Sequence, residues 1–189
     1  MANLIRQLGL VSETKQIDLA EATHVAAAID KQATRDFGPI WGTNSSIHAF
    51  ARLEEVPLGY WPMIIQDDIG VAGAAGIHLD KDGQPYVLIT SGEGWSLTAS
   101  HETMEMLADP FGNRLIAGPS IMKGQGRVSY LVEVCDPSEA SAFAYTVNDI
   151  LVSDFYTPSY FDPVKAAGVR YSFTGAITGP RQVLKGGYL

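Results

Sequence analysis

The chain has 189 residues, of which 46% are hydrophobic and 18% are charged, and its formal net charge is −8. This composition is typical of a globular chain that can bury a core, and we expect a single domain over residues 1–189. The acidic balance argues against a nucleic-acid partner, which needs a basic face, and against an anionic membrane surface.

The only cysteine, Cys135, cannot form a disulfide within the chain, which favours a reducing compartment. The first eleven residues lack a continuous apolar segment followed by a small-residue cleavage site. No segment approaches the roughly 18 uninterrupted apolar residues of a membrane-spanning helix. We therefore expect a cytoplasmic protein without a signal peptide, with release by lysis or non-classical secretion left open.

Hydrophobic periodicity changes along the first ninety residues. A helical rhythm over residues 17–37 predicts a first helix, and alternation then predicts strands. The strands are expected at residues 47–52, 60–66, 77–79 and 85–90. The glycine-rich residues 70–76 lack the Lys-Ser/Thr ending of a phosphate loop and are expected to form a flexible connection.

Residues 96–110, SLTASHETMEMLADP, carry the polar groups whose spacing is most informative. Ser96 or Thr98 is expected to cap a helix, and Pro110 should end it near Asp109. Residues four apart lie on one helical face, so His101 and Glu105 would point the same way, with Glu102 beside them. This arrangement offers two metal ligands and a neighbouring base.

The second half of the chain is expected to be mostly β or irregular. A lobe boundary falls near residue 110, giving an N-lobe over about residues 1–110 and a C-lobe over about residues 111–189. Glycine-rich residues after Pro110 suggest a short hairpin. Strand-like alternation follows at residues 128–134 and 149–155, and a closing hairpin is expected over residues 171–189.

The sequence His101-Glu102-x-x-Glu105 resembles the HExxH signature of zincin metallopeptidases, in which two histidines bind zinc and the glutamate is the general base. Glu105 stands where that signature has its second histidine. A carboxylate is an accepted zinc ligand, but it also favours harder cations such as Ca or Mn. The longer pattern SHExxExxxDP, with EVCDP downstream, is similar to a group of bacterial and phage-type proteins.

This resemblance implies an α+β, zincin-like fold. In such a fold an N-terminal helix and a mixed sheet pack on the active-site helix, and an edge strand above that helix holds an extended peptide. A mostly β or irregular lobe would follow. The implied activity is that of a zinc-dependent peptidase acting on a peptide or protein substrate, with Glu102 as general base.

A catalytic zinc ion needs a third protein ligand. Asp109 lies about 12 Å along the helix axis from His101, at about 1.5 Å per residue, which is too far to share its ion. Glu133 is the preferred third ligand, because it lies where a strand enters a turn, and His78 is the reserve. Asp109 and Asp136 are expected to orient ligands or stabilise turns.

Two tyrosines, Tyr156 and Tyr160, are candidate donors to a developing oxyanion, with loop anchoring as the simpler role. A different class of function stays open. The chain could be a non-catalytic accessory protein of a phage or secreted type, which keeps a zincin-like fold around a structural ion or none. A two-carboxylate glycosidase is disfavoured, since the sequence shows no sugar-binding groove beyond scattered aromatic residues.

Overall fold

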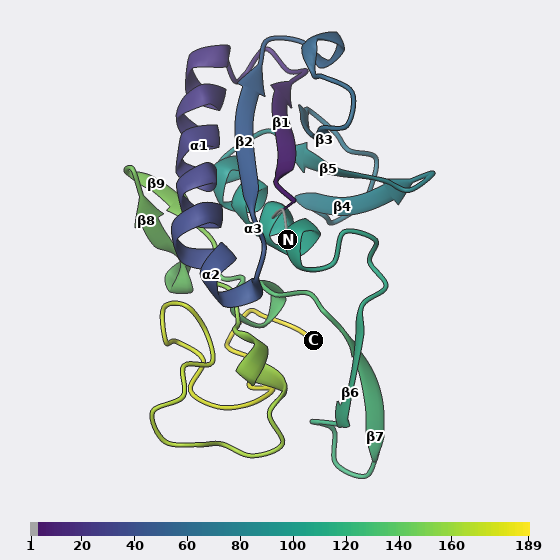
Figure 1. Ribbon diagram of the computed structural model, residues 1–189, viewed down its shortest axis with the longest axis vertical. Helices are drawn as coiled ribbons and strands as arrows, with labels where there is room; N and C mark the ends of the chain where they lie inside the picture. Colours follow the sequence, from purple (N-terminus) through teal and green to yellow (C-terminus); the bar gives the residue numbers. More distant parts are fainter. Residues whose placement is uncertain (1–3) are drawn as a thin grey trace.

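A five-stranded mixed sheet forms the centre of the computed structural model, which describes residues 4–189 (Figure 1). The strand order is β2-β1-β3-β5-β4. Strands β1, β2, β3 and β5 are parallel, and the edge strand β4 is antiparallel to β5. The strands are β1 (Arg6–Ser12), β2 (Ser45–Phe50), β3 (Trp61–Gln66), β4 (Gly76–Lys81) and β5 (Gln84–Thr90). The mixed α and β content and the mixed sheet confirm the coarse fold prediction; β1 was not predicted.

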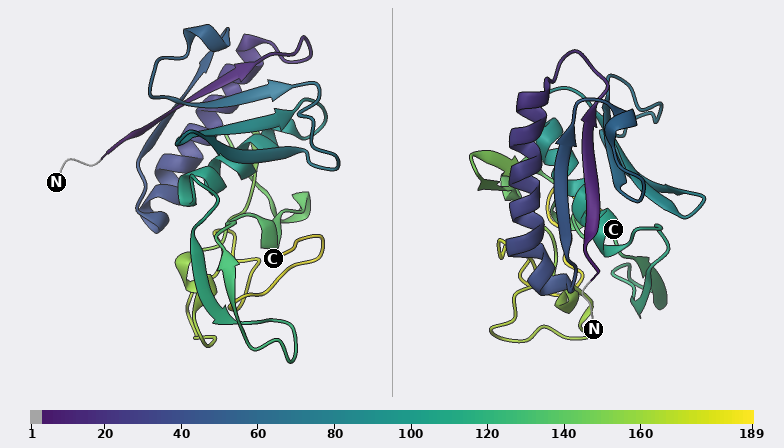
Figure 2. Two further views of the ribbon diagram at one scale, coloured as in Figure 1. Left: turned by 90° about the vertical axis from the view of Figure 1, so that its right-hand side faces the viewer. Right: turned by 45° about the horizontal axis from the view of Figure 1, so that its top comes forward.

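Helices α1 (Leu19–Lys31) and α3 (Trp95–Ala108) pack on the sheet (Figure 2). Alternate residues of β3 and β5 are buried, which places one apolar face of the sheet against the helices. These residues form one core cluster with apolar side chains of both helices. Helix α1 continues through a π-helical segment, Gln32–Phe37, into the short helix α2 (Gly38–Trp41), so the predicted first helix is confirmed and extended.

Helix α3 ends with Asp109 as its C-cap, as predicted, but its start differs from the prediction. Gly94 is the N-cap residue, with φ of 81°, and no side chain caps the helix. Glycine enters this left-handed conformation without strain. The helix therefore begins two residues earlier than a Ser96 cap would place it and four residues earlier than a Thr98 cap would. Ser96 and Thr98 therefore lie within the first turn.

A buried hydrogen-bond network holds the middle of α3. The Ser100 hydroxyl donates to Gln32 Oε1 over 2.8 Å, and it accepts from Ser153 N over 2.8 Å. Gln32 Nε2 in turn donates to the Ser153 carbonyl over 2.9 Å. The Trp95 indole donates to Glu21 on α1 over 2.9 Å. Because buried polar groups without partners are destabilising, this network fixes the rotation of α3 and hence the direction of His101.

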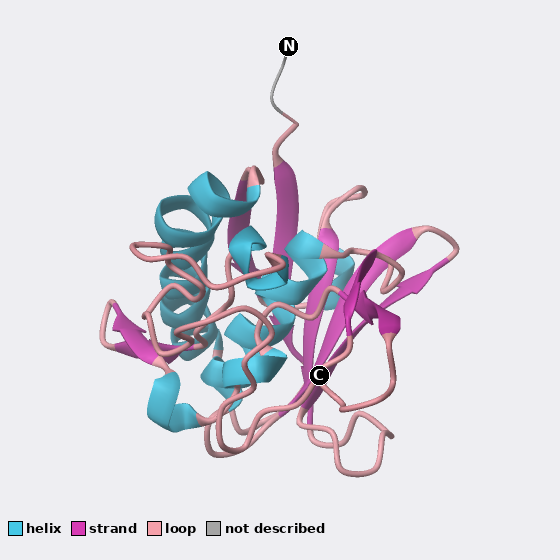
Figure 3. Ribbon diagram, turned by 90° about the horizontal axis from the view of Figure 1, so that it is seen from below, coloured by secondary structure: helices cyan, strands magenta, loops and turns pink. Residues whose placement is uncertain are grey.

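After α3 the described chain is made of two hairpins, three short 3-10 segments and loops (Figure 3). One hairpin pairs β6 (Leu115–Pro119) with β7 (Arg127–Leu131), and the other pairs β8 (Tyr145–Val147) with β9 (Ile150–Val152). The predicted strands at residues 128–134 and 149–155 are thus present but shorter. The three 3-10 segments are Asp136–Ser138, Ser141–Phe143 and Pro158–Phe161, and a further one, Leu53–Glu55, lies earlier in the chain between β2 and β3.

The predicted closing hairpin over residues 171–189 is wrong. These residues form loops whose backbone groups bond to distant segments. Phe173 N donates to the Phe155 carbonyl over 2.9 Å, and Leu184 N donates to the Pro137 carbonyl over 2.9 Å. Because these backbone groups find hydrogen-bond partners in distant segments, they do not need to pair with each other in a local hairpin.

No helix within residues 4–189 combines the length and apolar character needed to cross a membrane.

Candidate metal centre

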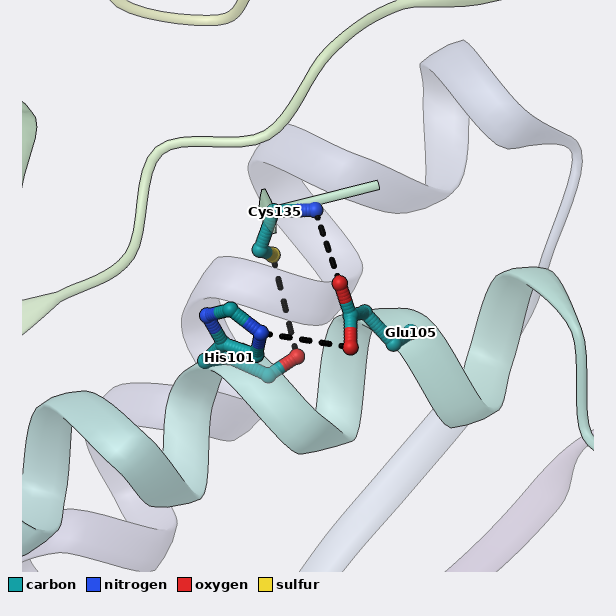
Figure 4. A group of neighbouring side chains, drawn as sticks. All are labelled: His101, Glu105 and Cys135. Carbon is teal, nitrogen blue, oxygen red and sulfur yellow. Dashed lines mark hydrogen bonds and ion pairs between the residues drawn. The ribbon is translucent and has the colours of Figure 1, made fainter. Parts of the chain in front are cut away.

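Helix α3 presents its polar residues on the side that faces β4. His101 Nε2 lies 3.2 Å from Glu105 Oε2, as the four-residue spacing predicted (Figure 4). Glu102 and Glu105 are buried, with 7% and 3% of their surfaces exposed. A histidine and two carboxylates are therefore concentrated on one buried helical face.

Strand β4 brings a second histidine to this face. His78 is directly opposite Val87 of β5, a residue of the core. Side chains directly opposite each other in an antiparallel pair share a face of the sheet, so His78 points towards α3. Its Nδ1 lies 3.6 Å from Glu102 Oε2 and 3.8 Å from Glu105 Oε2. The reserve ligand of the sequence analysis is thus placed at the centre of the site.

The chain after β7 completes the cluster. Glu133 Oε2 lies 3.9 Å from His78 Nε2, and Asp136 Oδ1 lies 3.2 Å from His101 Nε2. The backbone N–H of Cys135, between these two acids, donates to Glu105 Oε1 over 3.1 Å. This bond fixes the turn against α3, so that one carboxylate falls beside each histidine.

The acidic surroundings change the proton affinity of both histidines. Burial acts to lower the pKa of His78, but Glu102, Glu133 and Glu105 outweigh it and raise the pKa to about 9. Burial also acts to lower the pKa of His101, and Glu105 and Asp136 again outweigh it and raise that pKa well above the usual value. Without another cation, the histidines are the positive partners of these carboxylates.

Two of the carboxyl groups, those of Glu105 and Glu133, and the Cys135 thiol have pKa values shifted towards their neutral forms. Burial, followed by the charge of Glu105, raises the pKa of Glu133 to about 8. Burial is also the main cause of the raised pKa of Glu105. Burial and Glu105 raise the pKa of the Cys135 thiol well above its usual range. A site that holds so much acid in a low-dielectric environment requires positive charge if its groups are to ionise.

A divalent cation fits this environment. Within residues 4–189, the ion pairs of this cluster are all made by its two histidines, and no lysine or arginine contributes to them. His78 Nε2, Glu133 Oε2 and Asp136 Oδ1 are buried and have no hydrogen-bond partner. Two groups have ligand atoms close enough to hold an ion, namely His78, Glu105 and Glu133, and His101, Glu105 and Cys135. The donor set of imidazole and carboxylate suits Zn and, with more oxygen ligands, Mn or Ca.

The other predicted site residues lie outside this group of ligands. Asp109 ends α3, and its carboxylate accepts from the backbone of Asn113 and Arg114 over 3.1 and 2.7 Å. This is the turn-stabilising role that the sequence analysis considered for it. Tyr156 and Tyr160 stack with their ring centroids 4.3 Å apart and are fully buried. The Tyr160 hydroxyl donates to the Gln182 carbonyl, whereas the Tyr156 hydroxyl has no partner.

A third tyrosine, Tyr188, was missed by the sequence analysis. It lines a cleft of about 610 Å³ that also includes His78, His101, Glu102 and Glu105. Its backbone N–H donates to the Asp136 carbonyl over 3.2 Å. Gly187 makes this approach possible, because a Cβ there would lie 2.5 Å from the Pro137 carbonyl oxygen. The preceding glycine is the only local signal of this placement, since the contact joins residues about fifty positions apart.

The cleft continues on both sides of the cluster. On one side it opens into a space of about 490 Å³ between Ala72–Gly76 and the start of α3, and on the other into a space of about 470 Å³ against the β6–β7 hairpin. Tyr188 lines all three spaces. The three spaces share lining residues and form one depression around the cluster.

Comparison of the chain with family models, curated proteins and solved structures finds no match.

Proposed function

We propose that this chain is a metal-dependent hydrolase, most directly a zinc peptidase of zincin-like architecture, which cleaves an extended peptide. The observation that carries this proposal is the position of Glu102. It belongs to the same helix face as the ligands His101 and Glu105, and it lines the same cleft. A site that only held a structural ion would have no use for an additional buried carboxylate beside its ligands.

In this proposal Glu102 takes a proton from the attacking water and passes it to the leaving amine. The bound cation would supply Lewis acidity and would lower the pKa of that water. Glu105 is held by the Cys135 N–H and keeps a fixed orientation. Tyr188 is a better candidate than Tyr156 or Tyr160 for donating to the developing oxyanion, because it lines the open cleft whereas both of the others are buried.

The arrangement of β4 supports a peptide as substrate. This strand is at the edge of the sheet, and residues 77–80 line the cleft beside α3. The backbone groups on the outer side of an edge strand can pair with an added extended segment. The spaces that adjoin the cluster would accommodate residues on either side of the cleaved bond.

The proposal is tested with the parent protein and Glu102→Gln, each equilibrated with Zn and incubated with a mixture of unstructured peptides analysed by mass spectrometry. We expect cleavage by the parent and a loss of about 10²- to 10⁴-fold in Glu102→Gln, the range typical for a general base, with unchanged metal content. Glu139→Gln, which also lines the depression, is the control and should keep its activity.

If the Zn-loaded parent cleaves nothing, or if Glu102→Gln is as active as the parent, the hydrolase proposal fails. Metal binding without cleavage would instead favour the alternative of a structural ion in a non-catalytic accessory protein.

A further inference from the structure

The cluster contains more ligands than one ion uses. A catalytic zinc ion takes three protein ligands and leaves a position open. Here two histidines and four carboxylates meet, those of Glu102, Glu105, Glu133 and Asp136. If Glu102 is set aside as the base, five ligands remain.

The two histidines approach one carboxylate oxygen from different positions. His101 Nε2 lies 3.2 Å and His78 Nδ1 lies 3.8 Å from the same atom, Glu105 Oε2. An ion bound by both rings at about 2.1 Å would need their nitrogens within about 4.2 Å of each other. The two histidines do not share one group of ligand atoms. His78 is grouped with Glu105 and Glu133, and His101 is grouped with Glu105 and Cys135, so Glu105 is common to both groups.

Unpartnered buried atoms occur at both ends of the cluster. His78 Nε2 and Glu133 Oε2, 3.9 Å apart, lack hydrogen-bond partners at one end, and Asp136 Oδ1, 3.2 Å from His101 Nε2, lacks a hydrogen-bond partner at the other. The His78 side chain is only 6% exposed and that of Asp136 only 7% exposed, so water contact does not satisfy them. Because buried polar atoms almost always have partners, an ion at one end would leave the other end unexplained.

The charge of the cluster also indicates two metal ions. The four carboxylates carry four negative charges when ionised, and the histidines are neutral when they bind metal. One divalent ion leaves two negative charges uncompensated in a buried site, whereas two ions neutralise it.

We propose that the cluster binds two divalent cations, one held by His78, Glu105 and Glu133 and the other by His101, Glu105 and Asp136, with the Glu105 carboxylate bridging them. In two-metal sites the metal ions lie about 3.5–4 Å apart and stabilise both the attacking and the leaving group. Asp136 is the preferred ligand over Cys135, because its Oδ1 is buried without a hydrogen-bond partner, whereas the Cys135 thiol already donates to the His101 carbonyl over 3.7 Å. This inference rests on the proposed function, and it adds a second metal ion to the proposed metal site.

The test is a titration of the untagged, chelator-treated chain with Mn(II), in which free Mn(II) is followed by electron paramagnetic resonance. We expect two ions per chain and a bound signal broadened by coupling between neighbouring ions. Glu133→Gln and Asp136→Asn should each reduce the number to one and remove the coupling. Cys135→Ser and His48→Ala, which changes a histidine outside the cluster, should keep two.

A count of one ion in the parent overturns the two-ion assignment and leaves the proposed function standing. Two ions that persist in both Glu133→Gln and Asp136→Asn also overturn it, because they would be bound elsewhere. A count of zero with Mn(II) overturns the two-ion assignment, and a count of zero with Zn as well, measured by elemental analysis, overturns the proposed metal-dependent function too. The number of ions bound by the parent does not depend on whether any variant folds. For each variant, circular dichroism verifies that the protein is folded.

Discussion

Asp154 shows how a single buried carboxyl affects this fold outside the proposed ligand set. It is 0% exposed; its Oδ1 accepts from Thr174 N over 2.9 Å, and its Oδ2 has no partner. Burial is the main cause that raises its pKa above the usual value. The folded state therefore holds this proton more tightly than the unfolded state does. The corresponding stability is present below the ordinary pKa of 3.8 and is lost as pH rises through the raised pKa.

Asp154→Asn should remove this pH dependence, since an amide oxygen can still accept from Thr174 and the amide does not ionise. We expect the melting temperature of the variant, relative to the parent, to increase from pH 4 towards pH 8. Other titrating groups are common to both proteins and cancel in the difference. Asp82→Asn, in the exposed β4–β5 turn, is the control. If the melting temperatures of Asp154→Asn and the parent changed with pH in the same way across this range, Asp154 would not be the source of this pH dependence.

Individual site residues were predictable from the sequence to different degrees. The spacing of His101 and Glu105 on a helix is local information, and the structure places them 3.2 Å apart. Glu133 and Asp136 were singled out because of their position at the end of a strand, but which of them lies beside His101 depends on a turn fixed by the Cys135 N–H. Tyr188 could not be foreseen, because its contact with the Asp136 backbone is long-range.

At the scale of elements, the close approach of β4 to α3 determines the geometry of the cluster. Gly76 begins β4, and a Cβ there would lie 2.5 Å from Thr98 Cγ2 and 2.8 Å from Glu102 Cγ. Only a residue without a side chain lets the edge strand lie this close to the helix. The distance between His78 and the α3 carboxylates therefore depends on a glycine two residues away.

Gly76→Ala should push β4 away from α3. We expect a loss of about 1–3 kcal/mol in the free energy of unfolding, the usual range for overpacking, together with weaker metal binding. Urea denaturation and the Mn(II) titration measure the two effects. Gly179→Ala is the matched control, since its Cβ would meet only the flexible Lys165 side chain at 3.5 Å. Equal stabilities of the two variants would argue against a tight β4–α3 contact.

Elements with strong local signals were predicted, and those defined by long-range pairing were not. The helix ending at Asp109 follows from periodicity and a proline, and the strands at residues 77–79 and 85–90 follow from alternation. Strand β1 carries no comparable signal, yet it pairs with both β2 and β3 in the middle of the sheet. Residues 171–189 alternate as a hairpin would, but their backbone groups bond to residues near Phe155 and Pro137. Pairing over such distances is set by the whole fold and leaves little trace in local pattern.

At the scale of the whole molecule, three separate parts of the chain converge on the cluster: β4, α3 and the turn at residues 133–136. Four carboxylates gather here, and among the described residues 4–189 no lysine or arginine is an ion-pair partner of the cluster. Like charges brought together in this way oppose folding unless a cation joins them. We therefore propose that bound metal is part of the functional molecule.

The most direct test is elemental analysis of the untagged protein, purified without chelator and again after equilibration with Zn, Mn or Ca, beside Glu105→Ala. We predict at least one ion per chain in the parent and none in Glu105→Ala, because this carboxylate belongs to every proposed ligand set. Metal binding at this cluster would be contradicted if the parent held no ion under any of these conditions, or if Glu105→Ala held as many ions as the parent.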